Sequence, residues 1–346
     1  MRNPLPKAGQ APAPRVPTAG TTPQAAGRVF AGSSGPAAPT AGHTGGLGSE
    51  RLPGRPFDSA QLLLSDSLRR TSGAAPGALI VGVHLHELRV LLGRTVQDAA
   101  RLAGCRPADV EALEAGKPSV GAAFGVLSEL LASYRAPAVT DEERRELLFS
   151  PGRAVDSAAG QGGRLSALEC GALSRSSHPR SLPLPLRTDE LVALDAASGG
   201  GRYIAAPWRK AWERARRERR TVPVTFLGED VLTHDPHGRP DVIARQFSHL
   251  WDLVEDGWAD IRIVPRTAAG QIPGVVHEIM ALQGVVYGVE DTSAVTYHSS
   301  DTLDGARLAA QLQAMGTVAL KPVESHGRLA EARTGFLLRH SGGSAA

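Results

Sequence analysis

The chain has 346 residues, of which 38 are Lys or Arg and 35 are Asp or Glu, giving a formal net charge of +3. This excess is too small to identify a nucleic-acid-binding protein by charge alone, and the two cysteines, Cys105 and Cys170, exclude a disulfide framework and a zinc knuckle. No apolar stretch reaches the roughly 18 residues of a membrane-spanning helix, and no secretory signal is recognisable. We therefore expect a cytoplasmic protein that makes no membrane contact.

The first 56 residues consist almost entirely of Pro, Ala, Gly, Ser and Thr. They have too few apolar residues to build a core, so we predict a disordered tail over residues 1–56. Residues 57–80 are predicted to be a linker that contains a short helix at residues 61–70. The first compact domain is expected to begin near residue 81.

Three short helices are predicted between residues 84 and 118. Apolar residues recur at helical spacing in the first of them, at Val83, Leu85, Leu88, Leu91 and Leu92. Thr95 and Asp98 form the capping pattern of a second helix, and Gly104 ends that helix. Pro107 fits the first turn of the third helix. A capped helix, a Gly turn and another short helix in this order are typical of a helix-turn-helix.

The same segment carries a set of small, apolar and Gly positions, at Leu88-Arg89, Gly93-Arg94-Thr95, Ala100, Ala103-Gly104, Val110, Leu113-Glu114 and Gly116. In these positions it resembles the Xre-type regulators. The resemblance implies a DNA-binding transcriptional regulator that works as a homodimer on paired half-sites. The candidate DNA-contacting residues are Arg94, Thr95, Gln97, Arg106, Ala108, Asp109, Glu111 and Lys117.

The segment also departs from that family. The third helix of Xre-type regulators presents polar residues to the bases, whereas here its outward positions include the acidic Asp109 and Glu111. The Gln that usually follows the cap of the second helix is replaced by Val96. Five basic and five acidic residues between 81 and 118 cancel, so counterion release adds little affinity for DNA. An alternative hypothesis is therefore a protein-interaction module whose degenerate helix-turn-helix no longer reads DNA.

Two more helices are predicted before residue 153. The first carries Phe124, Leu127, Leu130, Leu131 and Tyr134 on one face. Thr140 and Glu143 form the capping pattern of the second. Together with the three helices before them, they predict a five-helix bundle over residues 81–153. The Ser-, Gly- and Pro-rich residues 154–186 are predicted to be a linker, with one docked helix at residues 165–173.

Residues 187–335 are predicted to form a second domain, followed by a disordered tail over residues 336–346. Its strands are expected at Val222–Leu227, Ile261–Val264, Val275–Leu282, Val285–Val289 and Ser293–Tyr297, and its helices at Val242–Val254, Leu303–Leu312 and Val323–Arg333. Gln283-Gly284 suits a two-residue hairpin turn. Because helices and strands do not alternate regularly, we predict an α+β fold with a mainly antiparallel sheet.

Several short motifs of this half are Phe226-Leu227-Gly228-Glu229, Arg245-Gln246-Phe247 with Leu250, Val264-Pro265, Val286-Tyr287 and Val289-Glu290. They resemble the C-terminal domain of antitoxin-like regulators from high-GC bacteria, in which the same helix-turn-helix is joined to this domain. The resemblance implies a domain that receives a signal from a small protein partner or a small-molecule ligand. An apolar Pro-Gly-Leu-Leu segment of that family is absent, and only Ala205-Ala206-Pro207-Trp208 stands near its place.

Two further clusters contain residue types that occur in binding sites. The basic run between Arg209 and Arg220, with Trp208 and Trp212, is interpreted as a solvated helix face with inward Trp side chains rather than as a phosphate-tracking surface. His234, Asp235, His237 and Asp241 flank Pro and Gly residues, which favours a turn over a metal site.

Neither a nucleophile elbow nor a phosphate loop nor a dinucleotide fingerprint occurs in the sequence. We therefore expect no enzyme activity, no catalytic residue, no cofactor and no metal. A ligand sensor or an enzyme centred on the second domain is a third, less favoured hypothesis.

Overall fold

The computed structural model describes residues 75–117, 120–136, 140–157, 163–198, 206–218, 222–269, 274–281, 284–291 and 294–343. All of them lie in one compact unit, residues 53–346. The predictions of a tail over residues 1–56 and of a helix over residues 61–70 lie outside the described residues. No helix in the described part of the chain combines the length and the apolar character needed to cross a membrane.

Five helices form the N-terminal part of the described chain. They are α2 (Pro76–Leu91), α3 (Val96–Ala103), α4 (Pro107–Glu114), α5 (Val120–Ser133) and α6 (Asp141–Phe149). Their shared core includes Leu85, Val110, Leu127 and Leu147, which are almost completely buried. These helices begin and end at signals that are local in the sequence, such as the capping boxes at the start of α3 and α6.

Helix α2 starts earlier than predicted and packs on two sides. Its first turns carry Leu79 and Ile80, which are buried in a core with Leu165 and Leu168 and with residues of the sheet. The first half of α2 is a continuous apolar run, because neighbouring elements cover it on nearly all sides. The predicted linker over residues 57–80 is therefore wrong at its end, where residues 76–80 are helical core.

The described strands form one seven-stranded sheet in the order β1-β7-β6-β5-β2-β3-β4. Their bounds are β1 Arg153–Asp156, β2 Leu173–His178, β3 Val224–Gly228, β4 Asp260–Val264, β5 Val275–Ala281, β6 Gly284–Glu290 and β7 Val295–Ser299. Pairing is antiparallel from β1 across to β2 and parallel from β2 to β4. The mixed α and β class is confirmed, but one edge of the sheet is parallel because helices connect its strands.

The hairpin predicted after residue 274 is present. Strands β5 and β6 pair in antiparallel register, with Ala281 opposite Gly284. Gly284 is therefore the first residue of β6 rather than a turn residue, and the two connecting positions, 282 and 283, lie outside the described residues. The predicted turn is thus displaced by one residue.

The predicted linker over residues 154–186 is wrong, because this segment supplies an edge strand and an interior strand of the sheet. It contains most of β1, helix α7 (Arg164–Gly171), strand β2 and the short 3-10 helix η1 (Leu184–Leu186). The many serines of this segment are typical of a linker, but two of those on β2 make hydrogen bonds to other parts of the chain. Ser174 Oγ donates to Glu278 Oε1 at 2.8 Å, and Ser177 Oγ donates to the Gly274 carbonyl at 3.2 Å. The docked helix within this segment is confirmed as α7.

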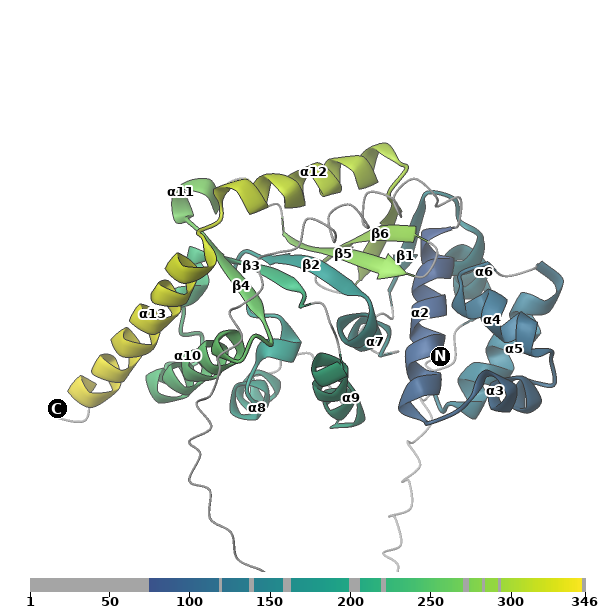
Figure 1. The fold of residues 1–346 in the computed structure, drawn as a ribbon, viewed down its shortest axis with the longest axis horizontal. Coiled ribbons are helices and arrows are strands. Elements are labelled where there is room, and N and C mark those ends of the chain that lie inside the picture. The colour runs from purple at the N-terminus through teal and green to yellow at the C-terminus, as the bar shows by residue number, and fades with distance from the viewer. Residues whose placement is uncertain are drawn as a thin grey trace, which may run out of the picture. The chain divides into compact units, whose positions relative to one another are not determined.

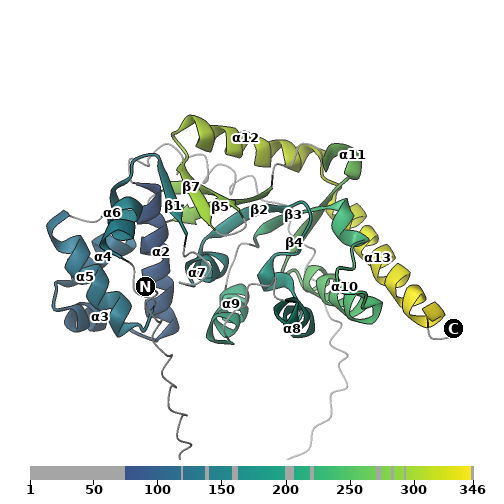
Figure 2. The same cartoon turned by 180° about the vertical axis from the view of Figure 1, so that it is seen from behind.

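The sheet is covered on both faces (Figures 1 and 2). Helix α12 (Leu303–Val318) lies over one face, and α7, α8 (Asp189–Ala197), α9 (Ala206–Glu218) and α10 (Pro240–Glu255) lie below the other. Helices α8 and α9 connect β2 to β3, and α10 connects β3 to β4. The parallel edge therefore has the connections of an α/β fold.

The last helix, α13 (Pro322–Gly343), runs beyond its predicted end. Residues 336–343, predicted as part of a disordered tail, continue this helix. Phe336 is fully buried, and its ring stacks on Phe247 of α10 with ring centroids 5.7 Å apart. The Ser-, Gly- and Ala-rich end of the sequence favours a tail and gives no sign of this long-range contact.

Candidate functional site

Helices α2 and α4 are locked together around one buried carboxylate. The side chain of Glu114 is only 6% exposed and accepts hydrogen bonds from Arg89 Nε at 2.6 Å and Arg89 Nη2 at 2.8 Å. His86 Nδ1 lies 3.1 Å from the second carboxylate oxygen. Burial on its own raises the pKa of Glu114, but the hydrogen bonds from Arg89 and His86 outweigh it and hold the pKa below its usual value.

Close backbone contact completes this interface. A Cβ atom added at Gly82 of α2 would lie 2.5 Å from the carbonyl oxygen of Glu114 and 2.7 Å from that of Leu113. Only a glycine lets the two helices approach so closely. The placement of α4 on α2 is thus fixed by packing and by the ion pair together.

The predicted DNA-contacting residues differ in their solvent exposure and in the contacts that they already make. Gln97, Ala108, Glu111 and Lys117 are exposed. Arg94 is turned inward, where its Nη1 donates to the Ser133 carbonyl at 3.2 Å and its guanidinium lies 5.3 Å from the centre of the Tyr134 ring. Contact between Arg94 and a phosphate would require the loss of these partners.

Two arginines, one in the last turn of α3 and one at the N-cap of α4, are held in local ion pairs. Arg106 is 81% exposed and reaches Asp109 through Nε at 3.1 Å and Nη2 at 2.9 Å. Arg101 makes the equivalent contact with Asp98 at 2.9 Å. Hydrogen bonds from Arg106 lower the pKa of Asp109, and those from Thr95 lower the pKa of Asp98, so both carboxylates stay charged. Part of the charge balance predicted from the sequence is therefore made of contacting pairs.

Thr95 has a structural role of its own. Its Oγ accepts from the Asp98 backbone N–H at 3.1 Å, and the Thr95 N–H donates back to the Asp98 carboxylate at 3.1 Å. We expect Thr95→Ala to lower the free energy of unfolding by about 1 kcal/mol, because the first turn of α3 loses its cap. Urea unfolding followed by circular dichroism measures this. Gln97→Ala, an exposed change on the same helix, is the control and should be nearly neutral.

A pocket of about 150 Å³ opens where the parallel strands β2 and β3 end, and we call it the β2–β3 pocket. Its polar rim includes Arg180, Asp195 and His234, and its apolar floor includes Leu191, Val231 and Phe247. In α/β sheets, ligands bind outside the carboxyl ends of parallel strands. Gly228, the last residue of β3, allows this arrangement, because a Cβ atom there would lie 2.3 Å from the Pro179 carbonyl oxygen.

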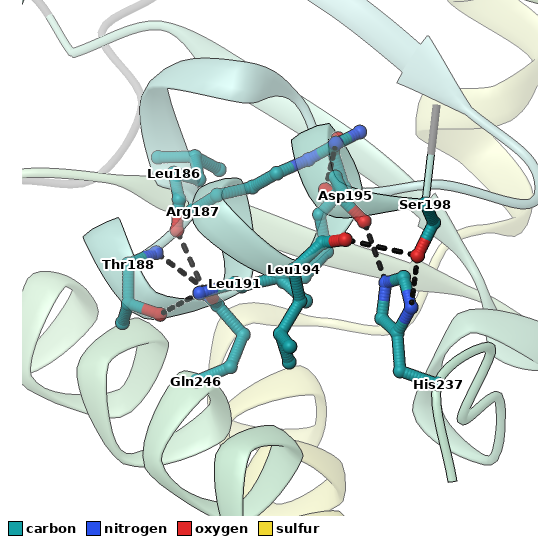
Figure 3. Close-up of polar contacts among 10 residues, drawn as sticks. Leu186, Arg187, Thr188, Leu191, Leu194, Asp195, Ser198, His237 and Gln246 are labelled. Atoms are coloured by element: carbon teal, nitrogen blue, oxygen red, sulfur yellow. Dashed lines mark hydrogen bonds and ion pairs between the residues drawn. The ribbon is translucent and has the colours of Figure 1, made fainter. Parts of the chain in front are cut away.

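The wall of the β2–β3 pocket is fastened to α10 by one buried amide (Figure 3). Gln246 is fully buried, accepts from the Thr188 N–H at 2.7 Å and donates to the Leu186 carbonyl at 2.8 Å. The Thr188 hydroxyl in turn caps α8 by accepting from the Leu191 N–H at 3.3 Å. One side chain therefore fixes η1, the start of α8 and α10 relative to one another.

A chain of polar contacts crosses the other side of the same pocket (Figure 3). Arg187 donates to the Leu182 carbonyl and, at 2.6 Å, to Asp195, and the other Asp195 oxygen lies 2.7 Å from His237 Nε2. His237 Nδ1 lies 3.3 Å from Ser198 Oγ. These contacts tie α8 to the loop between β3 and α10.

Ser198 contacts His237, which contacts Asp195, as the three residues of a hydrolytic triad do. The surroundings of Ser198, however, do not favour a nucleophile. The Ser198 hydroxyl donates to the Leu194 carbonyl at 2.9 Å and sits at the carboxyl end of α8. The helix dipole is negative there and disfavours a developing alkoxide. The arrangement positions His237 rather than activating a nucleophile.

In both of the further clusters, the described residues make local structural contacts. Residues 235–238 form a turn, in which Asp235 accepts from the backbone N–H groups of His237 and Arg239, while Asp241 pairs with Arg239 and Arg245. Trp208 of α9 is 8% exposed and packs inward. Arg209 pairs with Asp189, and the side chains of residues 216–220 lie outside those described.

Two of the resemblance motifs of the second half, residues 226–229 and 245–247, lie at or beside the β2–β3 pocket, which sequence reasoning missed. Gln246 is its clamp, Phe247 lies in its floor, and Gly228 ends the strand beside it. Arg245 bridges Glu190 of α8, with Nε–Oε2 at 2.8 Å. The only signal in the sequence was that these residues sit next to one another in short motifs; their partners are tens of residues away.

Comparison with known proteins covers one part of the chain. Residues 165–331 match the family described as Domain of unknown function (DUF5753). The β2–β3 pocket lies inside the matched range, and helices α2 to α6 lie outside it. No curated protein and no solved structure matches the chain.

Proposed function

We propose that this protein is a cytoplasmic, homodimeric DNA-binding transcriptional regulator in which α3 and α4 form a helix-turn-helix. The observation that carries the proposal is the two-sided character of α4. Its Val110 and Leu113 are buried against the other helices, while Arg106, Ala108 and Glu111 are exposed. In helix-turn-helix proteins the first residues of the second helix reach base edges in the major groove.

The connection between α3 and α4 also supports this function. Three residues join them, and Gly104 adopts a left-handed conformation with φ of 62°. Short turns that contain Gly join the two helices of helix-turn-helix motifs. The ion pair between Arg89 and Glu114 then holds α4 rigidly on α2, which is what a recognition helix needs in order to present its side chains in a fixed orientation.

The proposal is tested with DNA from upstream of the protein's own coding region. We expect the full chain to bind this DNA in fluorescence anisotropy, with an affinity that falls as salt rises. Arg106→Ala and Lys117→Ala should each weaken binding, because each removes a positive charge from the proposed DNA-binding surface, and Lys117→Ala should lower the salt slope by about one. Arg307→Ala, an exposed change on α12, is the control. Equal binding by all four proteins, or no binding in dilute buffer, would contradict the proposal.

The pairing of Arg106 with Asp109 gives a sharper expectation. Asp109→Asn removes a negative charge from the proposed reading face and frees the Arg106 guanidinium, so it should strengthen DNA binding. The same change in a protein-interaction module would leave the DNA result at background.

A second function is favoured by a different observation. Leu92 and Leu102 are 45% and 48% exposed at the ends of α2 and α3. Together with the acidic Asp109 and Glu111 on α4, these exposed apolar side chains favour contact with a protein over contact with the anionic DNA backbone. If no DNA is bound, light scattering of Leu102→Glu against the unchanged chain tests whether this surface joins two copies.

A further inference from the structure

We propose that the β2–β3 pocket binds a small monocarboxylate with a compact aromatic or branched apolar body. In the regulator proposed above, this ligand would be the signal that the second half of the chain receives, and in that sense the inference rests on the proposed function. The binding itself follows from the shape and the charge of the pocket.

The floor of the pocket sets the apolar part of the ligand. Leu182, Leu191, Val231, Ile243 and Phe247 contribute apolar surface from four separate segments. The pocket volume of about 150 Å³ is the size of an engineered lysozyme cavity that holds one benzene ring. One ring or one branched chain of four to five carbons is therefore the body that the pocket accommodates.

The rim sets the polar part. Arg180 lies two residues after the end of β2 and is exposed, and among the described residues its guanidinium has no hydrogen-bond or ion-pair partner. Arg187, the other arginine at the rim, is already bonded to Asp195 and to the Leu182 carbonyl. One free guanidinium beside an apolar floor matches one carboxylate on an apolar body, because guanidinium and carboxylate form paired, parallel hydrogen bonds.

The walls are fixed before any ligand arrives. Gln246 joins η1 and the start of α8 to α10, and Asp195 joins Arg187 to His237 across the rim. A site whose polar groups are already held in place loses little conformational freedom on binding. The apolar floor also argues against inorganic phosphate, which would leave that surface in contact with water or with an anion.

Isothermal titration of the full chain with benzoate tests the inference, and benzamide is the neutral probe of the same shape. We expect benzoate to bind more tightly than benzamide. Arg180→Gln should weaken benzoate about tenfold or more and leave benzamide unchanged, since only the charged contact is lost. Val231→Phe, which fills the floor, should abolish the binding of both probes.

Two controls locate the binding. Arg307→Gln removes an exposed arginine, which has no ion-pair partner among the described residues, from α12 on the opposite face of the sheet. Glu213→Gln changes a neighbouring hollow of about 420 Å³ that Trp212 and Trp258 line. Neither change should affect benzoate. Tryptophan fluorescence and the melting temperature of each variant show that the fold is kept.

Three results would overturn the inference: no benzoate binding at millimolar concentration, equal binding of benzamide and benzoate, or binding that survives both Arg180→Gln and Val231→Phe. Binding of inorganic phosphate with no binding of benzoate would also overturn it in favour of a plain anion site. The titration contains no DNA, and the DNA assay contains no ligand, so the inference and the proposed function fail independently.

Discussion

Replacing Glu114 by Ala is expected to lower the free energy of unfolding by about 3 to 5 kcal/mol. The loss is large because the change strands a charge. The Arg89 side chain is 11% exposed and would keep its guanidinium in the interface between α2 and α4 with no carboxylate to pair with. Urea unfolding followed by far-ultraviolet circular dichroism measures the loss, and hydrogen exchange in α2 and α4 shows where it occurs.

Glu111→Ala is the matched control for this experiment. It removes the same side chain from the same helix, three residues earlier, at an exposed position. Exposed substitutions of this kind change stability by about 0.5 kcal/mol or less. If the two variants unfold at the same urea concentration, Glu114 does not hold α4 on α2.

The same pair makes the stability dependent on acid. The pKa of Glu114 is lower in the folded chain than its ordinary value of 4.5, so the unfolded chain takes up the proton first as the pH falls. The contribution of Glu114 is therefore complete above about pH 5 and is lost as the pH falls from there through the folded pKa. Unfolding of Glu114→Gln, subtracted from that of the unchanged chain between pH 3 and 7, should show a difference that disappears toward the acid end.

Elements with local signals could be predicted from the sequence. Thr95 and Asp98 cap α3 at the position where the pattern places a cap, because both partners lie within one helical turn. The apolar stripe of Ile243, Phe247 and Leu250 faces the core on α10. Such signals depend on spacings of three or four residues, and the fold preserves them.

Features made by distant residues could not be predicted. Strand β2 pairs with β5 through residues about one hundred positions apart, as in Arg175 opposite Glu278, and the Ser-rich composition of β2 hid its place in the sheet. Around the β2–β3 pocket, Asp195 contacts His237 and Thr188 contacts Gln246, and the two residues of each pair are too far apart in the sequence to share a short motif. Loop and strand order decide which of these residues meet, and one sequence alone does not reveal that order.

A second large effect on stability is expected in residues 154–186, the segment predicted from the sequence to be a linker. Asp156 of β1 and Arg164 of α7 are 1% and 3% exposed and form two hydrogen bonds of 2.5 Å. Burial alone would lower the pKa of Arg164, but the hydrogen bonds and charge of Asp156 outweigh it and raise the pKa. We expect Asp156→Ala to cost about 3 to 5 kcal/mol of stability in urea unfolding, since it leaves a buried guanidinium unpaired.

A double variant separates the cost of a stranded charge from the value of the pair. Asp156→Leu combined with Arg164→Met replaces both ions by apolar side chains and should recover most of the loss, because a buried ion pair returns little more than it costs to remove from water. Arg153→Ala, an exposed change on the same strand, should be nearly neutral. A true linker would tolerate all of these changes. If Asp156→Ala left the unfolding midpoint unaltered, we would conclude that β1 and α7 are not part of the folded core.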